Sequence, residues 1–134
     1  MNTRVLERRM KDILFRAELS NHVCLLGGHS GEGKSFLFRK LQGAIEESWN
    51  RNYIYINHNN YNSILSRLHS DLEGYIIVFD DFELYPDNAI NILISNKNTL
   101  FVVICKDCFE YFGEDTGEYE IIHQEDLVLC RKKT

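Results

Sequence analysis

The chain has 134 residues, of which 44% are hydrophobic and 26% charged, and its formal net charge at pH 7 is −5. This length suits one domain with a single core, and no apolar run approaches the roughly 20 residues that span a bilayer, so no membrane partner is expected. The acidic charge disfavours a surface built mainly for nucleic acid, and the charged N-terminus is unlike a signal peptide, which leaves the cytoplasm as the expected compartment.

Residues 3–19 are predicted to form an amphipathic helix that packs on the core. The apolar residues that share one stripe at helical spacing are Leu6, Met10, Ile13, Leu14 and Ala17. The basic residues of the segment include Arg4, Arg8, Arg9 and Lys11. Contact with nucleic acid through these side chains is an alternative, but the acidic net charge favours an ordinary solvated face.

Residues 28–35 form a complete G-x-x-x-x-G-K-[ST] sequence, which is typical of loops that bind phosphate. Glycines let such a loop turn its backbone N–H groups toward a polyphosphate, while Lys34 can approach the β and γ phosphates and Ser35 can coordinate Mg²⁺. A buried strand at 23–26 and a following helix are predicted on either side, so the helix N-terminus would face the phosphates. The residues expected to contact the nucleotide are Gly28, His29, Ser30, Gly31, Glu32, Gly33, Lys34, Ser35 and Phe36.

The rest of the chain alternates between predicted strands and helices. In chain order we expect a strand at 53–56, a helix from Ile64 to Gly74, a strand at 75–79, a short helix that begins at Pro86, a strand at 100–104, and terminal strands at 119–122 and 127–129. The last two strands could pair as a hairpin at the sheet edge. Such alternation predicts a single α/β domain over residues 1–134, a three-layer sandwich with a mostly parallel five-stranded sheet and room for an extra C-terminal edge strand.

Asp80 and Asp81 directly follow the apolar strand predicted at 75–79. Because the carboxyl ends of parallel strands meet at one edge of a sheet, these carboxylates would lie near the phosphate loop. Asp80 is expected to hydrogen-bond Ser35 and to hold Mg²⁺ through water, and Asp81 to orient or deprotonate an attacking water. A turn residue at Asp80 and a loop or capping residue at Asp81 are the simpler alternatives.

With these two motifs the chain resembles the P-loop NTPases, with Walker A at 28–35 and Walker B at 76–81. The strand predicted between the motifs is similar to that of the additional-strand group, which includes the AAA+ and STAND ATPases. The resemblance covers residues 20–108 and implies a sheet order of 5-1-4-3-2, with ATP and Mg²⁺ as cofactors. It also implies a γ-phosphate sensor at Lys106 and, at Asn57, a polar residue that restrains the water-activating carboxylate. A solvent-facing lysine is the alternative at Lys106, whereas an ordinary turn asparagine is favoured at Asn57.

The chain departs from these families in ways that bear on its rate. It has too few residues after the fifth predicted strand for a helical lid and no evident arginine finger, and a missing finger can lower the rate by ~10³–10⁵. We therefore expect an ATPase that hydrolyses slowly and acts as a switch or motor subunit, with a protein partner or a second copy of the chain. Adenine is favoured over guanine by the resemblance, and because residues 96–99 lack the aspartate of an N-K-x-D motif.

Two other functions fit the same residues. The chain could be a non-catalytic module that keeps the fold as a scaffold for protein contacts, or a small phosphotransferase whose acceptor pocket the sequence does not identify. Cys105 and Cys108 have the C-x-x-C spacing of zinc or redox sites. A zinc site requires a second close pair of ligands, which the sequence lacks, so packing as a small hydrophobe is favoured for Cys105.

Overall fold

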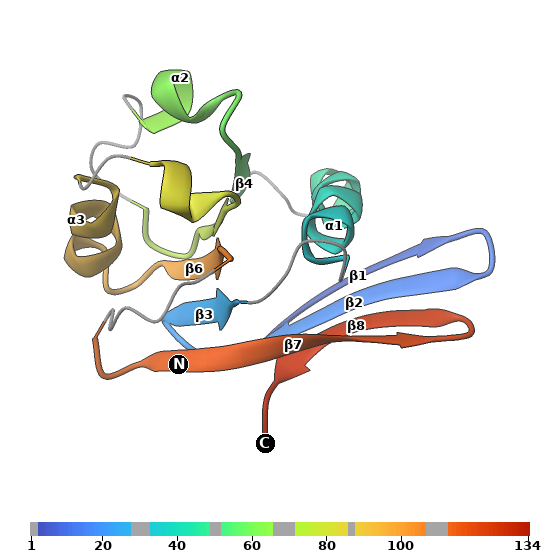
Figure 1. Ribbon diagram of the computed structural model, residues 1–134. Helices are drawn as coiled ribbons and strands as arrows, with labels where there is room; N and C mark the ends of the chain where they lie inside the picture. The colour runs from blue at the N-terminus through green and yellow to red at the C-terminus, as the bar shows by residue number, and fades with distance from the viewer. Residues whose placement is uncertain (1–2, 28–32, 49–51, 66–71, 86–87, 107–112) are drawn as a thin grey trace.

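An eight-stranded sheet forms the framework of the chain in the computed structural model, which describes residues 3–27, 33–48, 52–65, 72–85, 88–106 and 113–134 (Figure 1). The strands are β1 (Arg4–Met10), β2 (Ile13–Leu19), β3 (Val23–Leu26), β4 (Tyr53–Ile56), β5 (Ile76–Phe79), β6 (Leu100–Ile104), β7 (Thr116–Gln124) and β8 (Leu127–Lys132). The helices are α1 (Lys34–Ser48), α2 (Tyr61–Leu65) and α3 (Asn88–Ser95), with a 3-10 turn η1 (Phe82–Leu84).

The order of strands in the sheet is β1-β2-β8-β7-β3-β6-β5-β4. β1 pairs with β2, and β7 with β8, in antiparallel hairpins, whereas the other five pairings are parallel. β7 joins the two parts of the sheet, because residues 116–118 pair with β3 and residues 119–124 pair with β8. Since β3, β4, β5 and β6 run in one direction, their carboxyl ends share one edge, where ligands bind in parallel sheets.

The predicted three-layer sandwich with a mostly parallel five-stranded sheet is wrong. The sheet is mixed, contains eight strands and curls into a half-barrel. Two of the extra strands, β1 and β2, stand where the N-terminal helix was expected. The two terminal strands do pair as a hairpin, but β8 lies between β2 and β7 rather than at the sheet edge.

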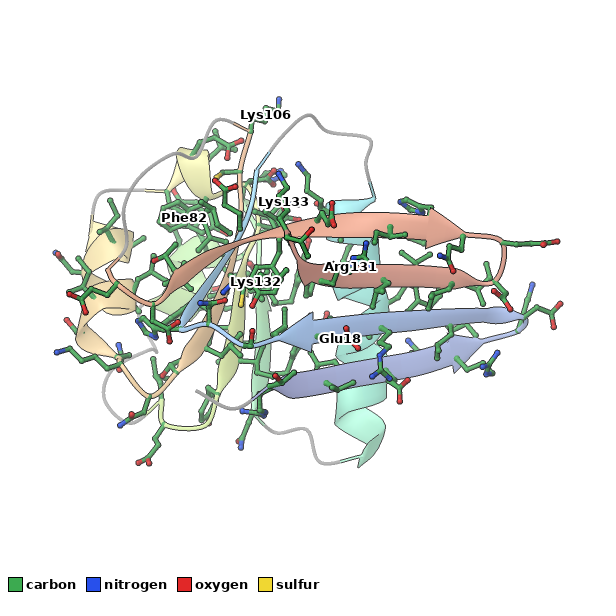
Figure 2. All side chains as sticks on the ribbon, turned by 90° about the horizontal axis from the view of Figure 1, so that it is seen from below. Glu18, Phe82, Lys106, Arg131, Lys132 and Lys133 are labelled. Carbon is green, nitrogen blue, oxygen red and sulfur yellow. The ribbon has the colours of Figure 1, made fainter. Side chains whose placement is uncertain are left out.

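The N-terminal segment forms a hairpin because its apolar residues also follow the two-residue period of a strand. In β2, Phe15, Ala17 and Leu19 are buried. Arg16 and Glu18 alternate with them and form an ion pair of 3.0 Å on the other face. Figure 2 shows the two hairpins side by side, with α1 behind them.

Alternate strand residues divide the core into two clusters, one on each face of the parallel strands. Helix α1 contributes Leu37, Phe38 and Leu41 to the first cluster, and α3 contributes Ala89 and Leu93 to the second. Every residue of β3, β5 and β6 is buried. These three strands are therefore covered on both faces, as their continuous apolar sequences predict.

The predicted helix from Ile64 and the one from Pro86 are described only in part. α2 ends at Leu65 in the described residues, and residues 66–71 lie outside them. α3 begins at Asn88, and Pro86 itself lies outside. Among the helices of the described residues, none is long and apolar enough to cross a membrane.

Gly117 in β7 lies against a hydrogen-bond network that joins β7 to the turn before β3. The Tyr119 hydroxyl donates to Asn21 Oδ1 (2.8 Å), and Asn21 Nδ2 donates to Asp115 Oδ1 (2.7 Å). Burial raises the pKa of Tyr119 to about 12, so its hydroxyl remains a donor at neutral pH. A Cβ on Gly117 would lie 2.4 Å from Asn21 Oδ1, which leaves no room for a side chain.

Gly117→Ala is therefore expected to lower the free energy of unfolding by about 1–3 kcal/mol, because the turn that carries Asn21 must shift. Urea unfolding measures the change. Gly27→Ala is the matched control, since a Cβ at Gly27 would meet nothing within 4 Å. Equal stability of the two variants would contradict the prediction.

Candidate functional site

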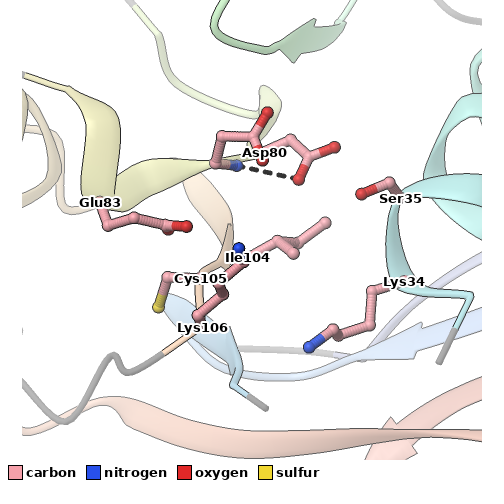
Figure 3. Close-up of a pocket in the computed structure, with 8 residues that line it drawn as sticks. Lys34, Ser35, Asp80, Glu83, Ile104, Cys105 and Lys106 are labelled. Carbon is pink, nitrogen blue, oxygen red and sulfur yellow. Dashed lines mark hydrogen bonds between the residues drawn. The ribbon is translucent and has the colours of Figure 1, made fainter. Parts of the chain in front are cut away.

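A pocket lies at the sheet edge where β5 and β6 end and α1 begins (Figure 3). The residues that line it are Lys34, Ser35, Asp80, Asp81, Glu83, Ile104, Cys105 and Lys106. Lys34 and Ser35 begin α1, Asp80 and Asp81 follow β5, and Lys106 follows β6. The pocket thus brings together five residues that the sequence predicts for phosphate and metal chemistry, and it takes them from three separate segments.

Lys34 is held near the carboxyl end of β3. Its Nζ donates a hydrogen bond of 3.2 Å to the carbonyl of Gly27, and the residue is only 6% exposed. The N–H of Leu37 donates to the carbonyl of Gly33 at 3.0 Å, which closes the first turn of α1. Gly33 has a φ of +81°, a left-handed conformation that glycine adopts without steric cost. The lysine therefore lies beside a helix N-terminus, where backbone N–H groups favour an anion.

Of the residues predicted to contact the nucleotide at the loop, apart from Gly33 and the two that line the pocket, only Phe36 is among the described residues. Gly28, His29, Ser30, Gly31 and Glu32 lie outside the described residues. Phe36 is described, but it is 44% exposed and does not line the pocket. Its ring lies edge-on to Phe15, with centroids 5.7 Å apart, and Lys40 Nζ lies 5.1 Å from its centroid. A nucleotide contact by Phe36 stays a prediction.

Asp80 is 4% exposed, and its carboxylate accepts hydrogen bonds from two donors of the described residues. The backbone N–H of Asp81 donates to Oδ1 at 2.9 Å, and the hydroxyl of Tyr55, from the neighbouring strand β4, donates to Oδ2. The predicted hydrogen bond from Ser35 is absent among the described residues, although Figure 3 shows the Ser35 hydroxyl and the Asp80 carboxylate facing each other. The sequence did not point to Tyr55, because the partner of a strand-end carboxylate depends on the register of the neighbouring strand.

Two buried tyrosines surround the Asp80 carboxylate. Burial raises the pKa of Tyr55, and the hydrogen bond to Asp80 raises it further. Burial also raises the pKa of Tyr85, with a smaller contribution from the charges of Asp80 and Asp81. The Tyr85 hydroxyl donates to the carbonyl of Ile56 at 2.9 Å. Both hydroxyls therefore remain protonated donors at neutral pH.

Asp81 has a left-handed backbone, with φ 56° and ψ 41°, and precedes η1. Its Oδ2 lies 2.7 Å from His58 Nδ1, in a pair at the rim of the site. Asn57 accepts hydrogen bonds from the backbone N–H groups of Asn59 (2.9 Å) and Asn60 (3.3 Å), the turn role that was favoured over a contact with this carboxylate. The residue that contacts Asp81 is the next one, His58.

The described residues that line the pocket include two lysines and three carboxylates, so their formal net charge is −1. Lys106 and Glu83 are exposed at its opening, whereas Lys34 and Asp80 are buried. A polyphosphate would be repelled by Asp80, Asp81 and Glu83 unless a cation offset them. The pocket therefore suits an anion that arrives with a divalent cation rather than an anion alone.

His123 of β7 is a neighbour of the loop that sequence reasoning missed. A Cβ built on Gly33 would lie 2.9 Å from His123 Cε1 and 3.0 Å from Nε2, so the imidazole ring fills the space that a side chain there would need. No local pattern could have found this contact, because the two residues are distant in sequence and meet only through the C-terminal hairpin.

The described residues of the pocket offer oxygen donors for a metal ion. Among the described residues, no group of three or more His, Cys, Asp or Glu side chains could hold a metal ion by itself. Mg²⁺ usually keeps several waters and is bound by one or two protein oxygens together with substrate phosphates. Ser35 and Asp80 supply such oxygens. Cys105 is buried at the end of β6, and Cys108 lies outside the described residues.

Comparisons with known proteins give little beyond this geometry. No family model matches the chain, and no curated protein matches it. Among solved structures, PCH-2 from C. elegans is similar to this chain with a TM-score of 0.42 and 15% sequence identity. The similarity covers 73% of this chain, which spans about a third of the length of that protein (35%). A likeness at this level carries no argument about function.

Proposed function

We propose that this chain binds ATP with Mg²⁺ at the pocket beside α1, hydrolyses it slowly, and acts as a switch or motor subunit with a protein partner or a second copy of itself. In this proposal the chain is a P-loop NTPase that resembles the additional-strand group, which includes the AAA+ and STAND ATPases. The expected activity is that of an ATPase.

One observation carries the proposal: the last two residues of a phosphate-loop sequence and the residues after an apolar strand line the same pocket. Lys34 and Ser35 come from the first segment, and Asp80 and Asp81 from the second. A chance glycine-rich turn would have no reason to meet an acidic strand end. The excess of carboxylates over lysines in the described lining, which suits an anion together with a cation, supports the same ligand.

Each described residue has a role that follows from its position. Lys34 would neutralise phosphate oxygens, and Lys106, at the end of β6, would contact the terminal phosphate. Ser35 and Asp80 would hold Mg²⁺, which would offset the charge of the phosphate oxygens. Asp81 would orient or deprotonate the attacking water. No arginine lines the described part of the pocket, which is consistent with slow turnover until a partner supplies one.

Lys34→Ala is expected to weaken Mg²⁺-ATP binding by about 10–100-fold, because a hydrogen bond to a charged group contributes about 1.5–3 kcal/mol. Isothermal titration calorimetry with the native chain and the variant measures this. Lys97→Ala is the matched control, since Lys97 is an exposed lysine before β6, away from the pocket. Equal affinities of the native chain and Lys34→Ala would contradict the proposal that Mg²⁺-ATP binds at this pocket.

Thermal melting separates this function from that of a scaffold without nucleotide. A ligand at ~100 times its dissociation constant stabilises the folded state by about 2.7 kcal/mol. The native chain is therefore expected to melt at a higher temperature with Mg²⁺-ATP than without it, and Lys34→Ala to shift less. An unchanged melting temperature for the native chain, together with no heat of binding, would favour the scaffold.

A further inference from the structure

We infer that Tyr55 is a positioning residue for the proposed magnesium site and acts through its hydrogen bond to Asp80. The inference rests on the proposed function, because it assigns Tyr55 to the same site. Tyr55 does not line the pocket and would touch neither nucleotide nor metal. Its effect would be to hold the carboxylate that does.

The geometry around Asp80 leaves its carboxylate little freedom to rotate. Tyr55 donates to Oδ2 and the backbone N–H of Asp81 donates to Oδ1, so each oxygen is held from a different direction. Asp80 is 4% exposed, which excludes most of the water that could replace a lost donor. Figure 3 shows the carboxylate, held in this way, directed toward Ser35. The two proposed magnesium ligands thus face each other because Asp80 is fixed.

Tyr53 and Tyr55 lie on the same strand but differ in the group that their hydroxyls contact. This comparison shows that the hydrogen bond from Tyr55 to Asp80 is more than packing. Both side chains lie on one face of β4, and both hydroxyls donate a hydrogen bond. Tyr53 donates to a backbone carbonyl, that of Phe38 in α1, at 2.7 Å. Tyr55 donates to a carboxylate, which makes a stronger, charge-assisted bond and fixes a side chain that could otherwise adopt other rotamers. Tyr53 serves the attachment of α1, whereas Tyr55 serves Asp80.

A donor that orients a metal-binding carboxylate affects metal binding without touching the metal. Loss of such a partner typically lowers metal affinity or activity by 10–100-fold. Because Asp80 is proposed to hold Mg²⁺ through water, the lower end of this range applies. Tyr55→Phe, which removes only the hydroxyl, is therefore expected to weaken Mg²⁺-ATP binding about tenfold.

The test is a double-mutant cycle between Tyr55→Phe and Asp80→Asn, with Mg²⁺-ATP affinity measured by calorimetry. If Tyr55 acts through the Asp80 carboxylate, its effect disappears once the carboxylate is replaced, and Tyr55→Phe in the Asp80→Asn background changes affinity by less than about twofold. Tyr53→Phe is the matched control: it also removes a tyrosine hydroxyl from β4 and is expected to leave affinity unchanged in both backgrounds. All variants are compared by thermal melting first, and binding is measured below the lowest melting temperature.

The possible results separate this inference from the function on which it rests. If the native chain does not bind Mg²⁺-ATP, the proposed function fails, and the inference fails with it. If the native chain binds but Tyr55→Phe binds equally well, only the inference is overturned. An equal loss in both backgrounds, or the same loss in Tyr53→Phe, would also overturn it, because Tyr55 would then act through general packing.

Discussion

Phe101→Ala is expected to lower the free energy of unfolding by about 3–5 kcal/mol, the typical cost of removing a buried phenylalanine. Phe101 lies in β6, between β3 and β5, and is fully buried. Its ring stacks on that of Phe79, with centroids 5.8 Å apart and planes 4° apart, and lies edge-on to the His22 ring at 5.5 Å. Because β6 is paired with β3 on one side and β5 on the other, we expect the strand to move little into the cavity, and the cost should be near the full value.

Urea unfolding of the native chain and the variant measures this loss, which is a large part of the roughly 5–15 kcal/mol that stabilises a domain. Phe36→Ala is the matched control, because Phe36 is 44% exposed and lies at the surface of α1. We expect it to cost much less than Phe101→Ala. A loss below about 1 kcal/mol for Phe101→Ala would show that the second core cluster is less tightly packed than its burial indicates.

The strands of the parallel part of the sheet were predictable because each is a short apolar run with no polar face. The strands predicted at 23–26, 53–56 and 100–104 coincide with β3, β4 and β6. A strand covered on both faces needs apolar residues at every position, and this requirement is visible in the sequence without knowledge of its neighbours. The same reasoning placed Asp80 and Asp81 at a strand end, where they meet the residues that begin α1.

The N-terminal hairpin was not predictable in the same way. Its apolar residues satisfy both a helical stripe and a two-residue alternation, so the pattern alone does not decide between helix and strand. The turn between β1 and β2 contains Lys11 at φ 55°, a position where glycine or asparagine usually marks a two-residue hairpin. The pairing of β2 with β8 favours a strand over a helix in this segment, and that pairing joins opposite ends of the chain.

Side-chain partners in the site were also beyond the sequence. Tyr55, His58 and His123 each approach a predicted residue from another element, at Asp80, Asp81 and Gly33 respectively. Such contacts depend on strand register and on the curvature of the sheet, neither of which has a local sequence pattern. Sequence motifs located the candidate site residues, and the fold supplied the residues that contact them.

Asp81→Asn is expected to lower the rate of phosphate release by about 10²–10⁴-fold, the usual contribution of general acid–base catalysis, while Mg²⁺-ATP affinity stays near native. The Asp81 backbone N–H donates to Asp80, and asparagine retains that N–H, so the Asp80 carboxylate keeps its position. Asparagine also tolerates the left-handed φ of 56° at this residue better than alanine would. The substitution thus removes the proposed base with little change in shape.

Phosphate release and calorimetric affinity are measured for the native chain, Asp81→Asn and Glu83→Gln. Glu83 is the matched control, because it is a second carboxylate that lines the same pocket, close by in η1. A loss of rate confined to Asp81→Asn assigns water activation to that residue, whereas equal losses would reflect the net charge of the pocket. A native rate in Asp81→Asn would leave Asp81 the simpler role of a turn residue held by His58, and an undetectable rate in the native chain would remove hydrolysis from the proposed function.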